Sequence, residues 1–519
     1  MNISPNLTHP IFEIIRSVAE HEGIDTYVVG GYVRDLLLRR KDGNKDIDCM
    51  VVPPEPANVN ADEPIGVSFA EKVVSQIERQ TGNHTKLSEF KTFGTAMFHF
   101  DDTEIQFVGA RKESYSANSR KPAVENGTLE DDLSRRDFTI NAMAAVVYRT
   151  DGTPFGTLID KFNGLDDLKN QALRTPLNPD TTFSDDPLRM LRAIRFASQL
   201  YFDIEAETFE AVMRNAHRID ILSSERITEE FNKILLSPKP SYGLRFLDAS
   251  RLLEKILPEV TNLKGIEKVG NMGHKDNFLH TLEVLDNVAD ATSRCEDKDH
   301  ILWLRWAALL HDVAKPATKK FDPVQGWTFH GHEVLGAKIA SKIFKRLKLP
   351  QNEKLEYIKK LINLHLRPII LSEDVTDSAV RRILFDAGSD IDDLMLLAKA
   401  DITSKNRDKV TQYRANLDSV KKKILEIEEK DRIRNFQPPV TGEDIIEYFN
   451  LTSKISEEPL KTRIQEALGK ANIRIIDLMA VGVIKTRIKD AILDGDIENN
   501  REQAWNLMLE IGAELGLTH

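Results

Sequence analysis

The sequence of 519 residues contains only two cysteines, Cys49 and Cys295, which lie far apart and without a metal-binding spacing. This scarcity argues against a disulfide framework and against a zinc site built from cysteines. No apolar run approaches the roughly 18 residues that a membrane-spanning helix needs. The N-terminal residues also lack the basic segment and apolar core of a secretory signal. We therefore expect a cytoplasmic protein with no membrane partner.

The sequence also has no excess of basic residues. It contains 71 lysines and arginines and 82 aspartates and glutamates, which gives a net charge of -11. Phosphate neutralisation supplies most of the affinity of general nucleic-acid binders, so this balance argues mildly against that class. This balance does not exclude a local basic surface, such as the one that Arg189, Arg192 and Arg195 would form. The length is too great for one hydrophobic core and predicts several domains.

The spacing of apolar residues divides the chain. Strand-length apolar or alternating runs at residues 46–52, 94–100 and 104–110 predict a sheet in the first part. From about residue 182 onward, apolar residues recur every three or four positions, which predicts helices. Stretches rich in glycine, asparagine or proline near residues 262 and 434 indicate domain junctions. We expect an α+β chain of four parts, namely residues 1–150, 151–261, 262–433 and 434–519.

Two aspartates flank one isoleucine where the apolar run DIDCMVV begins. In a strand, residues two apart point to the same face, so Asp46 and Asp48 would present their carboxylates side by side. Two neighbouring negative charges repel each other unless a cation lies between them. A D-x-D pattern alone is weak, because exposed strand ends carry it often.

A glycine pair strengthens the metal interpretation. Gly30 and Gly31 lie between a predicted strand and a predicted helix that carries Arg34 and Asp35. A glycine turn at the start of a helix lets backbone N–H groups approach a triphosphate. Two carboxylates on one face can hold Mg²⁺ ions that bridge to those phosphates, as in two-metal nucleotidyl transfer.

Four further segments occur in order: LEDDLSRRDFTINAMA (129–144), DKFNGLDDLKNQALRT (160–175), DDPLRMLRAIRF (185–196) and LSSERITEEFNKIL (222–235). With the glycine turn and the aspartate pair, they make this region resemble the class II tRNA nucleotidyltransferases, the CCA-adding enzymes, which share their head with bacterial poly(A) polymerases. The resemblance implies a nucleotidyltransferase head with a small mixed or antiparallel sheet, followed by an all-helical neck and a helical C-terminal tail.

The resemblance also implies roles for particular residues. Asp46 and Asp48 would be catalytic and hold Mg²⁺, while residues of several motifs would bind the nucleotide. The nucleotide-binding residues are Gly30, Gly31, Arg34, Asp35, Arg136, Asp137, Asn141, Asp186, Arg189, Arg192 and Arg195. Asp186 and Arg189 match the pair that reads the incoming base by hydrogen bonds. The implied substrates are tRNA, CTP and ATP. By itself, SRRDF fits a capped helix start with exposed charge equally well, and a solvated helix face is the alternative for the arginines after residue 188.

Some positions depart from the family pattern. Asp185 stands where the family usually has glutamate, and Gln106 stands where a strand often carries a third carboxylate. Glu104 lies on the same predicted face and is a candidate replacement. The basic signature of poly(A) polymerases is absent from SEFKTFGTAMF, and residues 111–133 look like the flexible loop with which CCA-adding members switch from C to A. Full CCA addition is therefore favoured over poly(A) synthesis, and A-only or CC-only addition stays open.

A second set of metal-ligating residue types lies between residues 262 and 430. A lone histidine on a helix is usually structural, but here an adjacent His-Asp pair in an apolar helix is followed by further His and Asp at wide spacing. This pattern resembles the HD phosphohydrolase superfamily, whose members hydrolyse phosphoesters with one or two divalent ions. The implied ligands are His280, His311, Asp312 and Asp401 for a first ion and His332 and His365 for a second. His330 competes with His332, and a transition metal such as Ni²⁺, Mn²⁺ or Co²⁺ suits these ligands.

Three hypotheses result. The first is a CCA-adding enzyme with a second phosphohydrolase activity, for which 2′,3′-cyclic phosphate ends are a candidate substrate. The second makes the HD domain the main activity and the head a device for tRNA recognition. The third is a degenerate RNA-binding protein, supported only by Gln106. The oligomeric state cannot be read from the sequence.

Overall fold

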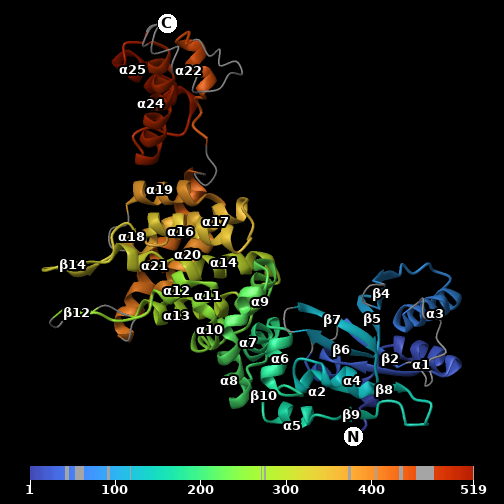
Figure 1. The fold of residues 1–519 in the computed structure, drawn as a ribbon. Coiled ribbons are helices and arrows are strands. Elements are labelled where there is room, and N and C mark those ends of the chain that lie inside the picture. The colour runs from blue at the N-terminus through green and yellow to red at the C-terminus, as the bar shows by residue number, and fades with distance from the viewer. Residues whose placement is uncertain are drawn as a thin grey trace. The chain divides into compact units, whose positions relative to one another are not determined.

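The computed structural model describes residues 1–40, 46–52, 64–90, 94–116, 119–269, 272–273, 276–371, 376–403, 406–431, 437–451 and 473–517 (Figure 1). The chain separates into two compact units. One comprises Met1–Thr261 with Arg346–Leu349, and the other comprises Asn262–Lys345 with Pro350–His519. The α+β class is confirmed, since the sheet lies in the N-terminal region and helices dominate the rest of the chain.

The first unit is built on a mixed sheet, in which seven strands are found among the described residues. In spatial order these are β3 (Ser88–Phe90), β4 (Thr95–Phe100), β5 (Thr103–Gly109), β2 (Asp46–Val52), β1 (Asp25–Val29), β8 (Met143–Tyr148) and β9 (Leu158–Asp160). All neighbouring strands are antiparallel except β2 and β5, which are parallel. The strands predicted at residues 46–52, 94–100 and 104–110 correspond to β2, β4 and β5. Because β9 pairs with β8, the sheet continues past residue 150.

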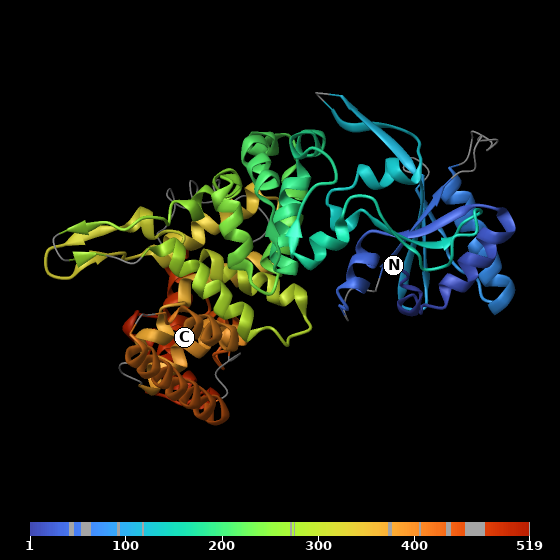
Figure 2. The same cartoon turned by 90° about the horizontal axis from the view of Figure 1, so that it is seen from below.

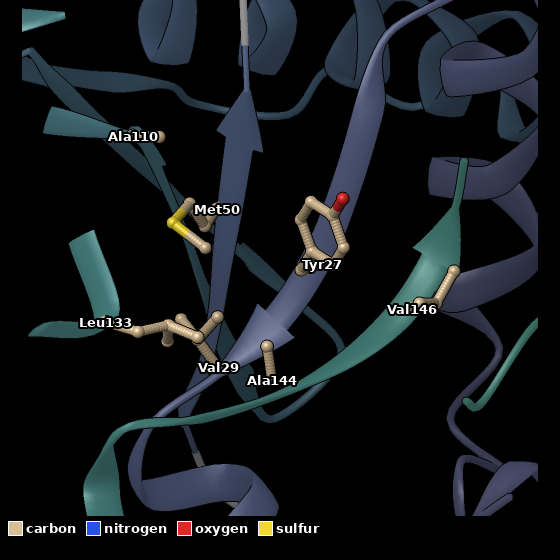
Figure 3. Close-up of a cluster of buried hydrophobic side chains, with 7 residues drawn as sticks. All are labelled: Tyr27, Val29, Met50, Ala110, Leu133, Ala144 and Val146. Carbon is tan, nitrogen blue, oxygen red and sulfur yellow. The ribbon is translucent and has the colours of Figure 1, made fainter. Parts of the chain in front are cut away.

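Successive side chains of β2 point to opposite faces of the sheet, and one of these faces contributes both to the hydrophobic core and to the candidate site. Met50 is fully buried with Tyr27, Val29, Ala144 and Val146 from the neighbouring strands (Figure 3). Asp46 and Asp48 lie on this same face, four and two residues earlier in the strand. The apolar cluster therefore ends where the carboxylates begin.

Helices complete the first unit. Those around the sheet are α1 (Ile11–Glu22), α2 (Gly31–Leu37), α3 (Ile65–Thr81) and α4 (Leu129–Ser134). Later in the chain come α5 (Gly164–Lys169), α6 (Pro179–Asp185), α7 (Leu188–Leu200), α8 (Ala206–Asn215), α9 (Ser224–Leu235), α10 (Pro240–Ala249), α11 (Leu252–Ile256) and α12 (Pro258–Thr261). The expected all-helical neck is interrupted by a parallel pair of two-residue strands, β10 (Ala172–Leu173) and β11 (Asp203–Ile204).

The segment expected to be a flexible loop starts with an antiparallel hairpin, β6 (Arg111–Ser116) and β7 (Ser119–Asn126), and ends in α4. Figure 2 shows this hairpin extending from the sheet. A capping box of Thr128 and Asp131 fixes the start of α4, because each side chain bonds the backbone N–H of the other residue.

The second unit is mainly helical. Its helices are α13 (Asn277–Ala291), α14 (Lys298–Leu310), α15 (Lys315–Thr318), α16 (His332–Arg346), α17 (Glu353–Leu364), α18 (Arg367–Leu371), α19 (Asp377–Ala387), α20 (Ile391–Asp401), α21 (Arg407–Asp431), α22 (Gly442–Tyr448), α24 (Ile473–Asp494) and α25 (Arg501–Glu514). Two short hairpins, β12 (Lys268–Val269) with β13 (Met272–Gly273) and β14 (Lys320–Asp322) with β15 (Gly326–Thr328), interrupt them. Among the described residues, no helix is long and apolar enough to cross a membrane.

Candidate active sites

The carboxylates at the start of β2 meet a third acid through strand pairing. In the parallel register with β5, Asp46 lies opposite Glu104 and Asp48 lies opposite Gln106. Burial raises the pKa of Asp48, and the negative charges of Asp46 and Glu104 raise it further, against the opposing effect of Arg136. A bound cation would relieve this repulsion. Asp46 and Asp48 are therefore the acids at which we expect a divalent ion, and the replacement of the missing acid at Gln106 by Glu104, which lies opposite Asp46, stays a prediction.

The glycine turn lies directly against these acids. Gly30 has φ of +75°, and a Cβ built on it would lie 2.8 Å from a guanidinium nitrogen of Arg136 and 3.7 Å from Oδ2 of Asp48. Only glycine leaves that space open. Two guanidinium groups supply positive charge at the turn, that of Arg34 beside Gly31 and that of Arg136, which also pairs with the buried Asp132 at 3.1 Å.

A continuous hydrogen-bond network runs behind the turn. Arg34 donates two hydrogen bonds to Asp35, at 2.9 and 2.8 Å, and a third to the side-chain oxygen of Asn141 at 2.7 Å. Asn141 donates to Asp137 at 3.0 Å, and Arg192 donates to the other oxygen of Asp137 at 2.8 Å. Burial opposes ionisation of Asp137, but Arg192 and Asn141 outweigh it and hold the pKa of this carboxyl at about 2. The network fixes the arginines in place.

Nearly all the predicted nucleotide-binding residues line one cavity of 610 Å³. Its walls are Gly30, Gly31, Arg34, Asp46, Asp48, Arg135, Arg136, Asp137, Asn141, Asp186, Leu188, Arg189, Arg192, Arg195 and Phe196. Asp35 is the one predicted member that supports the wall from behind, through Arg34. Sequence reasoning missed Arg135, Leu188 and Phe196 as wall residues, although Arg135 precedes the predicted Arg136 and Phe196 closes the motif RAIRF.

Phe196 and Glu230 organise the arginines of α7. The guanidinium carbons of Arg34, Arg192 and Arg195 lie 5.1, 5.4 and 4.3 Å from the centre of the Phe196 ring. Arg195 is only 8% exposed, and its Nε lies 3.2 Å from Oε2 of Glu230 on α9 in a charge pair without hydrogen-bond alignment. Arg195 is thus neutralised by the protein, which leaves Arg189 and Arg192 as the more accessible members.

The pair implied to read the base lies at the start of α7. Asp186 follows α6, and its Oδ1 accepts a hydrogen bond from the backbone N–H of Leu188 at 3.2 Å. Arg189 donates to the backbone carbonyl oxygen of Arg135 at 2.7 Å. These bonds set both side chains in the cavity wall, where a carboxylate supplies acceptors and a guanidinium supplies donors.

In the second unit, six predicted metal ligands converge from five helices. His280 lies on α13, His311 and Asp312 follow α14, His332 begins α16, His365 follows α17 and Asp401 ends α20. Asp312 lies between two groups. Its Oδ2 is 3.5 Å from Nε2 of His280 and 3.2 Å from that of His311, while its Oδ1 is 3.3 Å from Nε2 of His332. Two ligand groups therefore form, His280 with His311 and Asp312, and Asp312 with His332 and His365.

The orientation of the four imidazoles fits a metal. The Nδ1 atoms of His311, His332 and His365 lie 2.7–2.8 Å from backbone carbonyl oxygens, and that of His280 lies 2.7 Å from the Thr403 hydroxyl. Three Nε2 atoms, those of His311, His332 and His365, are buried without a hydrogen-bond partner among the described residues, as is Oδ1 of Asp312. Buried orphan atoms are costly unless something binds them. The donor set suits one or two transition-metal ions.

The pKa shifts of the histidines in this cluster also indicate a site for a cation. Burial disfavours the charged form of His311, but Asp312 and Asp401 outweigh it and raise the pKa of His311 to about 10. Burial and the charge on His311 lower the pKa of His365 to about 4. The raised pKa favours a protonated His311, whose positive charge lies beside the carboxylates of Asp312 and Asp401 as that of a metal ion would. His332 belongs to the cluster, whereas His330 is outside it.

Family models match three successive parts of the chain. The Poly A polymerase head domain matches residues 26–174, the probable RNA- and SrmB-binding site of polymerase A matches residues 201–264, and the HD domain matches residues 277–406. The first covers the sheet with its aspartates, and the third covers all six ligands of the second cluster.

Curated relatives resemble the chain over most of this span. An A-adding tRNA nucleotidyltransferase of Deinococcus radiodurans is 37% identical over 53% of this chain and 60% of its own length. A CC-adding tRNA nucleotidyltransferase of Thermus thermophilus is 30% identical over 73% of this chain and 76% of its own. A multifunctional CCA protein of Dechloromonas aromatica is 32% identical over 63% and 70%. The structure of a CCA-adding enzyme in its apo form II shares the fold, with a TM-score of 0.58, 21% identity and 99% coverage of both chains.

Proposed function

The chain belongs to the tRNA nucleotidyltransferase family that includes the CCA-adding enzymes, and on that premise we propose that it adds C, C and A to tRNA 3′ ends from CTP and ATP without a nucleic-acid template. The observation that carries the proposal is the 610 Å³ cavity, which joins the carboxylates of β2 to the arginines of α7. Paired acids beside fixed guanidinium groups suit a triphosphate and its counter-ions.

The residues of the cavity divide the work. When bound by Asp46 and Asp48, Mg²⁺ would supply charge stabilisation to the attacking hydroxyl and to the pyrophosphate leaving group. Arg136 meets the triphosphate at the glycine turn, and the network from Asp35 to Arg192 holds the remaining guanidinium groups ready before substrate arrives. The 3′ hydroxyl of the RNA loses its proton to solvent, its oxygen bonds to the α-phosphorus, and the bond from that phosphorus to pyrophosphate breaks.

Nucleotide choice is assigned to Asp186 and Arg189. Together they offer acceptors and donors that match the edge of cytosine and, after a small shift, that of adenine. Uracil and guanine leave charged groups unpaired, at a cost of roughly 1–3 kcal/mol each. Asp186→Ala should therefore admit UTP or GTP while tRNA affinity persists, as incorporation assays with all four nucleotides would show.

The test for the head uses purified protein, tRNA lacking its terminal CCA, and labelled nucleotides. We expect two additions with CTP alone, three with CTP and ATP, and none with Asp48→Ala. The matched control is Asp102→Ala, an exposed acid in the turn between β4 and β5, which should retain wild-type incorporation. Tails longer than three residues would indicate a poly(A) polymerase, and addition of only A or only CC would indicate those narrower activities.

A second activity is proposed for the HD domain, namely metal-dependent hydrolysis of phosphoesters such as 2′,3′-cyclic phosphate ends. The supporting observation is the set of orphan Nε2 atoms around Asp312. When bound, a transition metal such as Ni²⁺, Mn²⁺ or Co²⁺ would polarise the phosphate and activate water. Water bonds to phosphorus, one ring P–O bond breaks, and the released ribose oxygen takes a proton. Lys315 lies 2.5 Å from Asp312 and would hold the anionic substrate.

Hydrolysis of 2′,3′-cyclic AMP by metal-loaded protein tests this activity. Asp312→Ala should abolish hydrolysis and leave CCA addition unchanged. Asp392→Ala, an exposed acid on the helix that also carries Asp401, is the matched control and should retain both activities. If the loaded wild type hydrolyses neither cyclic nor monoester substrates, the HD cluster is structural.

We also propose that the chain has the four parts expected from its sequence, that its partners are tRNA, CTP and ATP, and that it lies in the cytoplasm.

A further inference from the structure

Two short hairpins are attached directly to the elements that carry the HD ligands. The hairpin β12–β13 ends shortly before α13, the helix of His280. The hairpin β14–β15 runs between α15 and His332, so it connects the segments that carry Asp312 and His332. Figures 1 and 2 show both hairpins projecting together from the helices of this unit. We call the described parts of these segments, residues 264–269 and 318–329, the paired arms.

Side-chain contacts hold the paired arms together and place cations over aromatic rings. Lys319 forms an ion pair with Glu267 at 2.5 Å, which links one arm to the other. The same lysine lies 5.2 Å from the centre of the Trp327 ring, and Phe321 meets that ring edge-on at 5.3 Å. Closer to the ligands, Lys315 lies 5.7 Å from the Phe329 ring. Lysines and aromatic rings thus alternate from the tip of an arm toward Asp312.

The outer surface of the arms is unusually apolar for exposed hairpins. Ile266, Val269, Phe321 and Val324 are 55%, 46%, 37% and 86% exposed. Phe321 lies opposite Trp327 in the register of β14 and β15, so the two rings share one face of the hairpin. An exposed ring beside a second ring provides a platform on which a nucleic-acid base can stack.

The charges of the arms leave a positive surface. Four lysines, Lys264, Lys268, Lys319 and Lys320, face two acids, Glu267 and Asp322, which gives the paired arms a net charge of +2. Glu267 is neutralised by Lys319. Lys268 and Lys320 are exposed on the two arms. In a chain of net charge -11, this local basic surface is complementary to a phosphate backbone.

We propose that the paired arms bind single-stranded RNA and guide its 3′ end to the HD cluster, so that the substrate of that cluster is an RNA terminus rather than a free nucleotide. This inference rests on the proposed hydrolase activity. Phe321 stacks on a base near the RNA end, and Lys268 and Lys320 meet the flanking phosphates. Neither group touches the scissile phosphate, so the arms act on substrate binding and not on the chemical step.

The experiment compares two substrates with the same scissile bond. One is 2′,3′-cyclic AMP, and the other is an eight-nucleotide single-stranded RNA that ends in a 2′,3′-cyclic phosphate. Phe321→Ala should raise the KM for the RNA by about fivefold or more, which is the lower limit for losing one base stack. The kcat and the KM for 2′,3′-cyclic AMP should stay within about twofold of wild type, because a mononucleotide has no flanking nucleotide to stack on Phe321 or to meet Lys268 and Lys320. Lys320→Glu should also raise the KM for RNA and reduce its dependence on salt.

Matched controls are available on α21 of the same unit. Tyr413 is 38% exposed, close to the value for Phe321, and Lys422 is exposed like Lys320. Tyr413→Ala and Lys422→Glu should leave both KM values unchanged. Equal effects of the arm variants on both substrates would overturn the proposal by making the arms part of the metal cluster. An unchanged KM for RNA would also overturn it. If light scattering then showed that wild type is dimeric and Phe321→Ala is monomeric, the apolar surface would be a contact between copies.

Fluorescence anisotropy separates this proposal from the one on which it rests. Metal-free wild type should bind a labelled single-stranded RNA, and Phe321→Ala should weaken this binding by about fivefold or more. If wild type hydrolyses neither substrate but Phe321→Ala still weakens RNA binding, the hydrolase proposal fails and the arms remain an RNA-binding surface. If wild type hydrolyses 2′,3′-cyclic AMP while arm variants bind RNA normally, only the inference about the arms fails.

Discussion

At the scale of single residues, Gly30 is the position where backbone and site constrain each other most. Its φ of +75° is unfavourable for any other residue, and a Cβ would meet Arg136 at 2.8 Å. Gly30→Ala should lower the free energy of unfolding by about 1–3 kcal/mol and displace Arg136 from the turn. The matched control is Gly31→Ala, whose Cβ would meet Arg34 at an ordinary 3.6 Å. Urea denaturation of both variants checks this, and equal losses would contradict it.

Asp137 predicts a pH dependence of stability. Its pKa is about 2 in the folded protein, below the value of 3.8 that is usual for an aspartate, so ionisation favours the folded state. That stabilisation is fully present well above pH 4 and is lost as the pH falls through about 2. The difference between these two pKa values corresponds to about 2.5 kcal/mol.

Asp137→Asn should remove this pH-dependent stabilisation. The difference in unfolding free energy between wild type and the variant should therefore shrink as the pH falls from about 5 to about 3. The control is Asp180→Asn, since Asp180 pairs with Arg214 but is 44% exposed and screened by solvent. Denaturant titrations at several pH values give the measurement, and a pH-independent difference would show that Asp137 is not the group responsible.

At the scale of elements, α7 and α9 are joined by the buried pair of Arg195 and Glu230. Their side chains are 10% and 5% exposed, so removing one partner leaves the other charge buried and uncompensated. Glu230→Gln should lower the free energy of unfolding by about 3 kcal/mol, in the range measured for broken buried pairs. It should also increase the KM for CTP, because Arg195 supports the Phe196 ring in the cavity wall.

The adjacent glutamate on α9 provides the control for that prediction. Glu229 pairs with Lys233 at 2.6 Å, but it is 64% exposed, so Glu229→Gln should have little effect. The double variant Arg195→Met with Glu230→Leu should recover stability, because no uncompensated charge is left. A double-mutant cycle by urea unfolding measures the coupling. A coupling near zero would mean that the two helices are held by apolar packing alone.

At the scale of the whole molecule, the two candidate sites lie in different compact units. A ligand that binds only folded protein stabilises it, by about 2.7 kcal/mol at a hundredfold excess over Kd. Ni²⁺ should therefore raise the Tm of a transition that belongs to the second unit, and Mg²⁺ with CTP should raise one that belongs to the first. Calorimetry of wild type, Asp312→Ala and Asp48→Ala checks this. A Ni²⁺ shift that survives Asp312→Ala would place the metal elsewhere.

The sequence alone determined those features that depend on local periodicity. The period of two along residues 46–52 placed Asp46 and Asp48 on one face, and β2 confirms that strand. Gly30 predicted a turn because few other residues adopt its backbone angles. The order of the motifs indicated the family, and the relatives confirm it. Each of these patterns spans only a few consecutive residues, so it can be recognised without the tertiary structure.

The tertiary structure decided which distant groups meet. The parallel pairing of β2 with β5 sets Glu104 beside Asp46, and no pattern in either strand specifies that register. Glu230 neutralises Arg195 because α7 packs on α9, and no spacing within the motif of α7 indicates that partner. His332 and not His330 lies with Asp312 and His365, because α16 begins at His332 and packs that residue inward. Such outcomes depend on how elements pack together, and packing is a property of the whole chain that local spacing does not contain.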